Sequence, residues 1–472
     1  MSTAIQQPQF DIEEFLAQEH SKDLLRLSTA GSVDDGKSTL IGRMLHDAKG
    51  AYEDQLKSAR RGGEIDFSLL TDGLRAEREQ GITIDVAYRY FATPKRKFIL
   101  ADTPGHEQYT RNMATGASTA ELAIILVDAA RGLTTQSRRH AYITALLGIP
   151  HFVIAVNKMD LIGYDESVFN TIRAEFEPFL QHVGAKNPYF LPLSALKGDN
   201  VVDRSKNMDW YRGPSLLEHL ESVETANRSI EASFRMAVQR VVRPDQNFRG
   251  YAGQISSGVI RPGDEVLALP SGRHTRVKRV VTFDGDLEVG HAPQSVTLTL
   301  EHEIDISRGD MIAGGVPPHI ARNFEATIVW FDGRPLDLTR DYLVKHTAQT
   351  VPVRVESVRH KVNVATLGTE SAEGFVMNEI GVVKLTAARP LFFDRYSDNR
   401  GTGSFILIDR ETNATVAAGM IRGAAAASLE NPADRLLRLV RNLIPAGVSV
   451  DLPEDEDEAI AVLREKLQGV IE

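Results

Sequence analysis

Residues 24–39 read LLRLSTAGSVDDGKST, an apolar strand that runs into a glycine-rich turn and then into a helix-forming stretch. The turn at 31–38 matches the pattern G-x-x-x-x-G-K-[ST], whose backbone N–H groups face bound phosphates. In this pattern Lys37 brings a positive charge to the β and γ phosphates, and Ser38 offers a hydroxyl to Mg²⁺. The helix that begins at Lys37 adds the positive end of its dipole. This context predicts a phosphate-binding loop rather than an ordinary turn.

Short apolar strands alternate with helix-like stretches from about residue 23 to residue 222. Further strands are expected at 98–102, 122–128, 152–157 and 189–194, with helices at 39–48 and 136–147. This alternation predicts a mostly parallel sheet with helices on both faces. Ligands bind such sheets at the carboxyl ends of the strands, where most of the motifs below are found.

The second motif is the stretch DTPGH, which follows an apolar strand directly. Asp102 is placed to hold Mg²⁺ through water, and Gly105 can donate its N–H to the γ-phosphate. His106 follows at the position where a residue can orient the attacking water. A histidine after a glycine is by itself usually a surface residue, and only its place in the motif favours the functional interpretation.

The third motif, NKMD at 157–160, indicates which base is bound. The carboxylate of Asp160 can accept hydrogen bonds from N1–H and the 2-amino group of guanine, and adenine lacks this pair of donors. A site built around such a carboxylate rejects a base that leaves it unpaired, so the motif favours GTP over ATP. The stretch SAL at 194–196 can offer backbone N–H groups to the guanine oxygen, although alone it carries no weight.

The fifth motif is GITID at 81–85. Thr83 can give its hydroxyl to Mg²⁺ when the γ-phosphate is present, which would make it a switch that senses the nucleotide. An isolated Gly-Ile-Thr is more often part of an edge strand. Its order and spacing between the first two motifs reverse that preference.

Together the motifs predict one site for GTP and Mg²⁺. The residues expected to act in hydrolysis are His106, Lys37 and Thr83, and those expected to hold Mg²⁺ are Ser38, Thr83 and Asp102. The residues expected to bind GTP are Gly31, Ser32, Val33, Asp34, Asp35, Gly36, Lys37, Ser38, Thr39, Asp102, Thr103, Pro104, Gly105, His106, Asn157, Lys158, Met159, Asp160, Ser194, Ala195 and Leu196.

Two carboxylates, Asp34 and Asp35, lie inside the phosphate-binding loop, where repulsion should cost affinity unless a cation intervenes. We therefore expect Asp34 to help hold a monovalent cation near the phosphates. The alternative is that both carboxylates point to solvent.

The pattern changes near residue 227 to short β-rich runs broken by turn signals such as Pro262-Gly263 and Asp284-Gly285. These runs indicate antiparallel barrels or sandwiches. The predicted fold is an α/β P-loop domain followed by two antiparallel β-barrel domains and a short helical tail. The expected segments are an N-terminal extension (1–22), a GTP-binding domain (23–226), β-barrel domain 2 (227–322), β-barrel domain 3 (323–425) and a C-terminal helical, acidic tail (426–472). The tail is interpreted as a docked helix with a solvated acidic linker, with a partner-binding tail as the alternative.

The five motifs in this order resemble those of the translational-type GTPases. Within that group, the stretch GSVDDGKSTLIGR at 31–43 resembles the large GTPase subunit of bacterial heteromeric ATP sulfurylase, the sulfate adenylyltransferase subunit 1 family. The third domain agrees, since NRGTGSFILID at 399–409 and TNATVAAGM at 412–420 are similar to that family. Elongation factors usually have histidine where this chain has Ser32 and Asp35.

The resemblance implies a role in sulfate assimilation. A small catalytic partner subunit would join ATP and sulfate to give adenylylsulfate and pyrophosphate, and GTP hydrolysis by this chain would drive that uphill reaction. The coupling would be conformational, because the GTP site and the sulfate chemistry are separate. The implied assembly is a heterodimer or larger, and no residue of this sequence is assigned to ATP or sulfate.

Composition bounds the remaining possibilities. The chain has 472 residues, 42% apolar and 25% charged, with no cysteine, so thiolate metal sites and cysteine nucleophiles are excluded. No apolar run approaches the length of about 20 residues that spans a bilayer, and no signal peptide is expected, so a cytoplasmic protein is predicted. The formal net charge of −10 argues weakly against a nucleic-acid surface, and no nucleic-acid partner is expected.

Two rival functions stay open at this stage. One is an elongation-factor-like GTPase that delivers aminoacyl-tRNA, and the other is a non-enzymatic scaffold with a degenerate nucleotide site. The intact Lys37, Thr83, Asp102 and Asp160 argue against the scaffold.

Overall fold

The computed structural model describes residues 22–48, 60–61, 64–70, 83–185, 188–225, 228–245 and 248–426. The chain divides into two compact units. The first comprises residues 1–227 and 362–369, and the second comprises residues 228–361 and 370–472.

A sheet in the order β4-β5-β1-β6-β7-β8 forms the centre of the first unit. Its strands are β1 (Asp23–Ala30), β4 (Ala87–Ala92), β5 (Arg96–Asp102), β6 (Leu122–Asp128), β7 (His151–Asn157) and β8 (Tyr189–Pro192). All neighbouring strands pair in parallel except β4, which runs antiparallel to β5 at the edge. The register sets Thr29 beside Asp102, and Asp128 beside Asn157. The carboxyl ends of four strands therefore meet at one edge.

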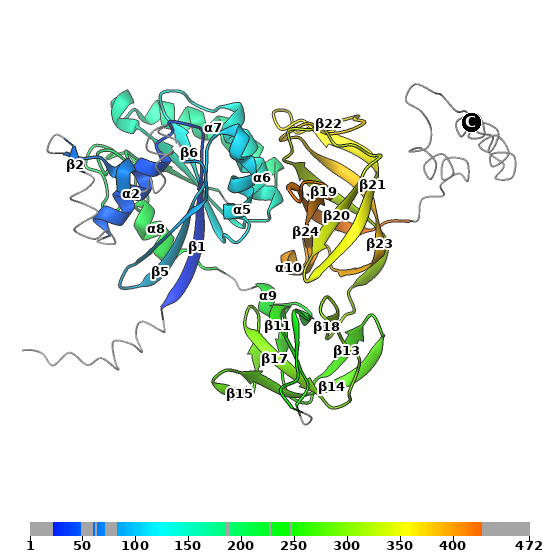
Figure 1. Cartoon of the computed structure of the whole chain (residues 1–472). Coiled ribbons are helices and arrows are strands. Elements are labelled where there is room, and N and C mark those ends of the chain that lie inside the picture. The colour runs from blue at the N-terminus through cyan, green and yellow to red at the C-terminus, as the bar shows by residue number, and fades with distance from the viewer. Residues whose placement is uncertain are drawn as a thin grey trace, which may run out of the picture. The chain divides into compact units, whose positions relative to one another are not determined.

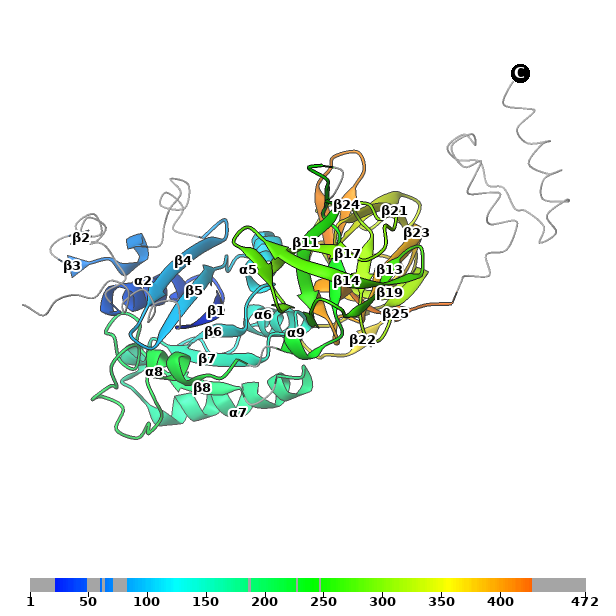
Figure 2. The ribbon, with the colours of Figure 1, turned by 90° about the horizontal axis from the view of Figure 1, so that it is seen from below.

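Helices cover both faces of this sheet (Figure 1). The helices are α2 (Lys37–Asp47), α5 (Thr110–Ala117), α6 (Thr135–Leu146), α7 (Glu166–His182) and α8 (Leu216–Ser222). Figure 1 shows α2 and α8 on one face, where their leucines share a core with β1, β5 and β6, and α5 and α6 on the other. α7 lies along β8 (Figure 2), with the Arg173 guanidinium 5.6 Å from the ring centroid of Phe190. Every residue of β6 is buried, as expected of a central parallel strand.

Short elements complete the described part of the first unit. They are β2 (Arg60–Arg61), β3 (Glu64–Ile65) and the 3₁₀ turns η1 (Phe67–Leu70), η2 (Glu107–Tyr109) and η3 (Met159–Ile162).

The second unit contains two closed antiparallel barrels. In the first barrel, the ladder β11-β17-β14-β13-β18-β9 closes through the pairing of β11 with β9. Its strands are β9 (Arg235–Ala237), β11 (Gly250–Ser257), β13 (Glu265–Leu269), β14 (Arg273–Thr282), β17 (Ser295–Leu300) and β18 (Met311–Ala313). A short helix and four flanking strands accompany them: α9 (Arg228–Glu231), β10 (Arg240–Val242), β12 (Val259–Ile260), β15 (Gly285–Leu287) and β16 (Gly290–His291).

The second barrel closes in the order β20-β24-β25-β19-β23-β21, because β20 also pairs with β21. Its strands are β19 (His319–Trp330), β20 (Asp341–His346), β21 (Gln349–Val362), β23 (Ile380–Phe393), β24 (Ser404–Asp409) and β25 (Thr415–Ala424), with β22 (Thr369–Glu370) at the edge and α10 (Arg400–Gly403) before β24. Buried aromatic side chains fill its centre, among them Phe324, Trp330 and Phe393.

The predicted fold class is confirmed: an α/β P-loop domain precedes two barrels rather than sandwiches. The helical tail predicted at 426–472 lies outside the described residues apart from its first residue. Among the described residues, no helix combines the length and apolarity needed to cross a membrane.

Candidate functional site

The phosphate-binding loop connects β1 to α2 and is held by its own side chains. Gly36 caps α2 with a φ of 91°, in the left-handed region that favours glycine. The ammonium of Lys37 is buried and donates to the carbonyl of Gly31 at 2.8 Å and of Ser32 at 2.9 Å. Burial lowers the pKa of Lys37, and the nearby carboxylates of Asp35 and Asp102 oppose that shift. The lysine is thus fixed where a phosphate would meet it.

The two loop carboxylates behave differently. Asp35 is 2% exposed, and its Oδ2 accepts from the backbone N–H of Ser32 at 2.6 Å, so it braces the loop from inside. Burial raises the pKa of Asp35, with Lys37 opposing the shift. The Asp34 side chain is 66% exposed, and one carboxylate oxygen lies 3.8 Å from the guanidinium of Arg131. The alternative in which both carboxylates point to solvent therefore fails for Asp35.

The DTPGH segment closes against this loop. The Thr103 hydroxyl donates to the Thr29 carbonyl, which anchors the start of the segment to β1. Gly105 approaches so closely that a Cβ there would lie 2.3 Å from Nζ of Lys37 and 2.5 Å from the carbonyl oxygen of Gly31. Only glycine fits this contact without a shift of the backbone.

A pocket of about 390 Å³ brings the phosphate motifs together. It is lined by Val33, Asp34, Gly36, Lys37, Ser38, Thr39, Thr83, Gly105, His106 and Lys158. Thr83 thus reaches the same pocket as the phosphate-binding loop, whereas Gly81 and Ile82 of its motif lie outside the described residues.

A smaller pocket of about 160 Å³ adjoins it, lined by Gly36, Thr39, Asn157, Lys158, Asp160, Leu161, Ala195 and Leu196. Asn157 organises this pocket: its Nδ2 donates to the Asp35 carbonyl at 2.8 Å, and its Oδ1 accepts from the Ala195 N–H at 2.9 Å. A single side chain therefore sets the spacing between the phosphate-binding loop and the SAL loop.

Several predicted binding residues line neither pocket; all of them are buried except Ser32, which is half-buried. Ser32 and Asp35 brace the phosphate-binding loop, and Gly31 accepts from Lys37. The others are Asp102, Thr103, Pro104, Met159 and Ser194.

Two residues of this region were not predicted from the sequence. The first is Leu161, which lines the smaller pocket and is 66% exposed. It adds an apolar side chain from the NKMD loop to that of Leu196, which was predicted from the SAL loop and is 57% exposed. The second is Asp128, at the end of β6, which accepts from the Lys158 ammonium at 2.8 Å. Burial alone would raise the pKa of Asp128, but the hydrogen bonds from Lys158 and the Ala130 N–H hold it below its usual value. The sequence did contain a signal for Asp128, because this residue ends an apolar strand in the same way that Asp102 does.

Known proteins resemble the chain over almost its whole length. The elongation factor Tu GTP binding domain family matches residues 22–231, and the GTP-eEF1A C-terminal domain-like family matches residues 323–422. Sulfate adenylyltransferase subunit 1 of Bacteroides fragilis is 52% identical over 465 residues, which cover 97% of each chain. The protein of that name from Chromobacterium violaceum is 54% identical over 87% of this chain and 88% of its own. The chain belongs to the sulfate adenylyltransferase subunit 1 family.

The resemblance predicted from the motifs is thereby confirmed. A further relative, the bifunctional enzyme NodQ of a Rhizobium species, is 51% identical over 88% of this chain but only 66% of its own length. The name of the sulfate adenylyltransferase relatives implies that a further subunit accompanies subunit 1 in those proteins.

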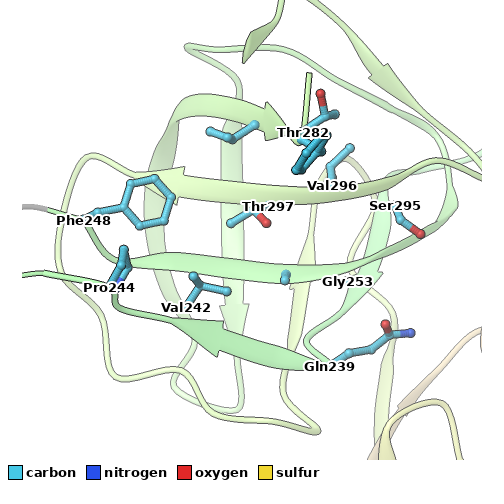
Figure 3. A pocket seen from close by; sticks show the side chains of 12 residues that line it. Gln239, Val242, Pro244, Phe248, Gly253, Thr282, Ser295, Val296 and Thr297 are labelled. Carbon is cyan, nitrogen blue, oxygen red and sulfur yellow. The ribbon is translucent and has the colours of Figure 1, made fainter. Parts of the chain in front are cut away.

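This member of the sulfate adenylyltransferase subunit 1 family also has a groove of about 480 Å³ on its first barrel (Figure 3). Phe248 and Pro244 lie at one end, and Gln239 and Ser295 lie toward the other (Figure 3). None of the described residues that line it is charged, so the groove offers no charged side chain to a phosphate or sulfate group.

Proposed function

We propose that the chain is the GTPase subunit of a heteromeric ATP sulfurylase, in which GTP hydrolysis drives the synthesis of adenylylsulfate and pyrophosphate from ATP and sulfate by a small catalytic partner subunit. The observation that carries the proposal is the joining of the two pockets. Gly36, Thr39 and Lys158 line both of them. A nucleotide would therefore place its base in one pocket and its phosphates in the other.

Guanine specificity is assigned to Asp160 in the smaller pocket. Its carboxylate would accept from N1–H and the 2-amino group, while the exposed Leu161 and Leu196 would cover the faces of the base. Within the SAL loop, the Ala195 N–H donates to Asn157 and the Ser194 N–H donates to the Asp199 carbonyl, so the loop is held in place and the Leu196 N–H would reach the guanine oxygen.

A magnesium ion fits the donor set of the larger pocket. The hydroxyl-bearing residues Ser38 and Thr83 line it, and oxygen donors are what Mg²⁺ prefers. Asp102, at the end of β5, would hold the ion through water. The ion would supply positive charge that offsets the charge on the β and γ phosphates.

Hydrolysis is assigned to three residues of this chain. The buried Lys37 would contact the β and γ phosphates, and Thr83 would report the presence of the γ-phosphate. His106 lines the pocket next to Gly105, where it would orient the attacking water. When the γ-phosphate leaves, Gly105 would lose a hydrogen bond and the DTPGH segment would be released.

The monovalent cation remains part of the proposal. Asp34 is exposed and lines the phosphate pocket, so it could share a cation with the phosphates. Such a cation would compete with Arg131, whose guanidinium lies 3.8 Å from the carboxylate.

We place this activity in the cytoplasm, without a membrane or nucleic-acid partner. The switch residue Thr83 and the DTPGH segment are the natural transmitters to the partner subunit, because both contact the pocket for the terminal phosphate. In this coupling, the partner subunit's reaction would proceed differently with each of two conformations of this chain.

The decisive experiment is co-expression of the full chain with the small sulfurylase subunit of its own organism. Pyrophosphate release from ATP and sulfate should require GTP, and ATP in its place should not suffice. The variant Lys37→Ala should make little product whether or not GTP is present. Synthesis that proceeds equally well without GTP would overturn the proposal, and selective binding of aminoacyl-tRNA in the GTP state would favour the delivery factor instead.

A further inference from the structure

We infer that Gln136 is a positioning residue for hydrolysis, which fixes the peptide between Gly105 and His106 and thereby the place of the His106 side chain. The inference rests on the proposed function and adds a residue to it. Gln136 lies in the first turn of α6, just after the N-cap residue Thr134, whose hydroxyl accepts from the Ser137 N–H. It belongs to no motif that the sequence singled out.

The amide of Gln136 is held in one orientation. Its Nε2 donates to the carbonyl oxygen of Gly105 at 3.3 Å and lies 2.9 Å from Nε2 of His140. Its Oε1 accepts from the guanidinium of Arg139 at 2.9 Å. An amide nitrogen can only donate and an amide oxygen can only accept, so the reverse orientation would lose the bond to the Gly105 carbonyl and the bond from Arg139.

His140 supports this orientation from within the domain. Its side chain is buried, and burial lowers its pKa to about 3, with Lys37 and Arg139 adding to the shift. The ring is therefore neutral near pH 7. Because the amide nitrogen of Gln136 donates to Nε2, the ring proton lies on Nδ1, which is buried and for which the described residues supply no hydrogen-bond partner. Leaving a buried polar group unpaired is costly. The fold bears this cost at Nδ1, and Nε2 thereby stays an acceptor for the Gln136 amide.

The bond from Gln136 matters because of which peptide it restrains. The carbonyl of Gly105 and the N–H of His106 belong to one planar peptide unit. Holding that carbonyl therefore fixes the direction in which the chain enters His106. Gly105 has no side chain of its own to restrain this turn, since its close approach to Lys37 and Gly31 excludes a Cβ.

The DTPGH segment is thus anchored at both ends. Thr103 ties its start to β1, and Gln136 ties its end to α6. The N–H of Gly105 stays available for the γ-phosphate, because Gln136 uses only the carbonyl. The carbonyl of Gly105 therefore helps to position His106, while the N–H of the same glycine is left to contact the γ-phosphate.

The test is a double-mutant cycle in the full chain co-expressed with its small subunit. Gln136→Leu removes the donor while keeping the bulk of the side chain. We expect kcat for GTP hydrolysis to fall about tenfold to a hundredfold, as for other misplaced catalytic groups, while KM changes less than about twofold. Gln181→Leu, an exposed glutamine on α7, is the matched control and should leave both values unchanged.

The background variant decides whether Gln136 acts through His106. In His106→Ala, the further change Gln136→Leu should cost almost nothing, because the group that it positions is already gone. The inference would be overturned if Gln136→Leu lowered kcat by the same factor in His106→Ala as in the wild type. It would also be overturned if Gln136→Leu alone raised KM and left kcat unchanged.

Binding of fluorescent GDP checks the fold of each variant. Should Gln136→Leu lose GDP binding, Gln136→Met replaces it, and loss of binding in both would also overturn the inference, since Gln136 would then support the whole domain. A wild-type chain that hydrolyses no GTP would instead defeat the proposed function.

Discussion

At the scale of single residues, Asn157 does the most to hold the nucleotide site together. Its side chain is 2% exposed and bridges the Asp35 carbonyl and the Ala195 N–H. Gly36 faces it so closely that a Cβ there would lie 2.5 Å from Nδ2 of Asn157. The asparagine therefore joins the phosphate side of the site to the base side.

Asn157→Ala should weaken guanine nucleotide binding about tenfold to a hundredfold. The change leaves a buried carbonyl and a buried N–H unpaired, which costs about 1–3 kcal/mol, and it frees the SAL loop from the phosphate-binding loop. The dissociation constant of fluorescent GDP measures the effect. Asn170→Ala, at an exposed position of α7, is the control and should bind GDP like the wild type. An unchanged affinity in Asn157→Ala would show that the two loops are held apart by other contacts.

The motifs predicted residues that the structure gathers around the two pockets, but they did not predict which of them line a pocket and which brace a loop. Asp35 and Ser32 were predicted as ligand-binding residues, whereas Asp35 braces the loop through the Ser32 N–H. Gln136 could not be predicted, because a glutamine in a helix carries no motif and gains its significance only from the carbonyl that the fold brings to it. Such contacts depend on tertiary packing, which spacing along the chain does not contain.

At the scale of elements, strands buried on both faces were the easiest to predict. β6 and β7 are runs of apolar residues, and both were expected at nearly their observed bounds. β4 was missed, since its sequence AYRYFA mixes polar and aromatic residues. Its exposed Tyr90 and its buried Phe91, which stacks on Phe98 at 4.7 Å, are typical of an edge strand with one covered face.

Helix α8 offers a prediction at this scale. The Ser215 side chain accepts from the Glu218 N–H, while the Glu218 carboxylate accepts from the Ser215 N–H at 2.8 Å, which forms a capping box. The Ser215 hydroxyl also donates to the Val202 carbonyl at 2.7 Å. Ser215→Ala should lower the free energy of unfolding of the first unit by about 1–2 kcal/mol, because it removes the cap.

This change is measured by unfolding the protein in urea and monitoring the release of bound fluorescent GDP. Ser222→Ala, at the exposed C-terminal end of the same helix, is the matched control, because its hydroxyl only donates to a carbonyl within the helix. A loss of stability as large in Ser222→Ala would mean that the capping box adds nothing specific.

At the scale of the whole molecule, polar contacts link the two barrels within the second unit. Gln349 Nε2 donates to the Gly309 carbonyl at 2.8 Å, and Asn399 Nδ2 donates to the Ser257 hydroxyl at 2.8 Å. A further link is the ion pair of Arg235 in β9 with Asp394, just after β23. The Arg235 side chain is only 3% exposed, and that of Asp394 is 18% exposed.

Arg235→Met should destabilise the second unit by about 3–5 kcal/mol, because it leaves the Asp394 carboxylate largely buried without its counter-charge. It also removes the donors to the carbonyls of Gly314 and Val316. Denaturant unfolding monitored by tryptophan fluorescence reports the loss, since Trp330 lies in the core of the second barrel. GDP binding to the first unit should not change.

The double variant Arg235→Met with Asp394→Met separates charge from packing. Replacing both partners removes the unpaired charge, so the double variant should be more stable than Arg235→Met alone, even though the Thr402 hydroxyl loses its acceptor at Asp394. A double variant as unstable as the sum of its single changes would mean that the barrels depend on the shape of this contact and not on its charge balance. The ion pair would then matter to the second unit as a well-fitted junction between its barrels.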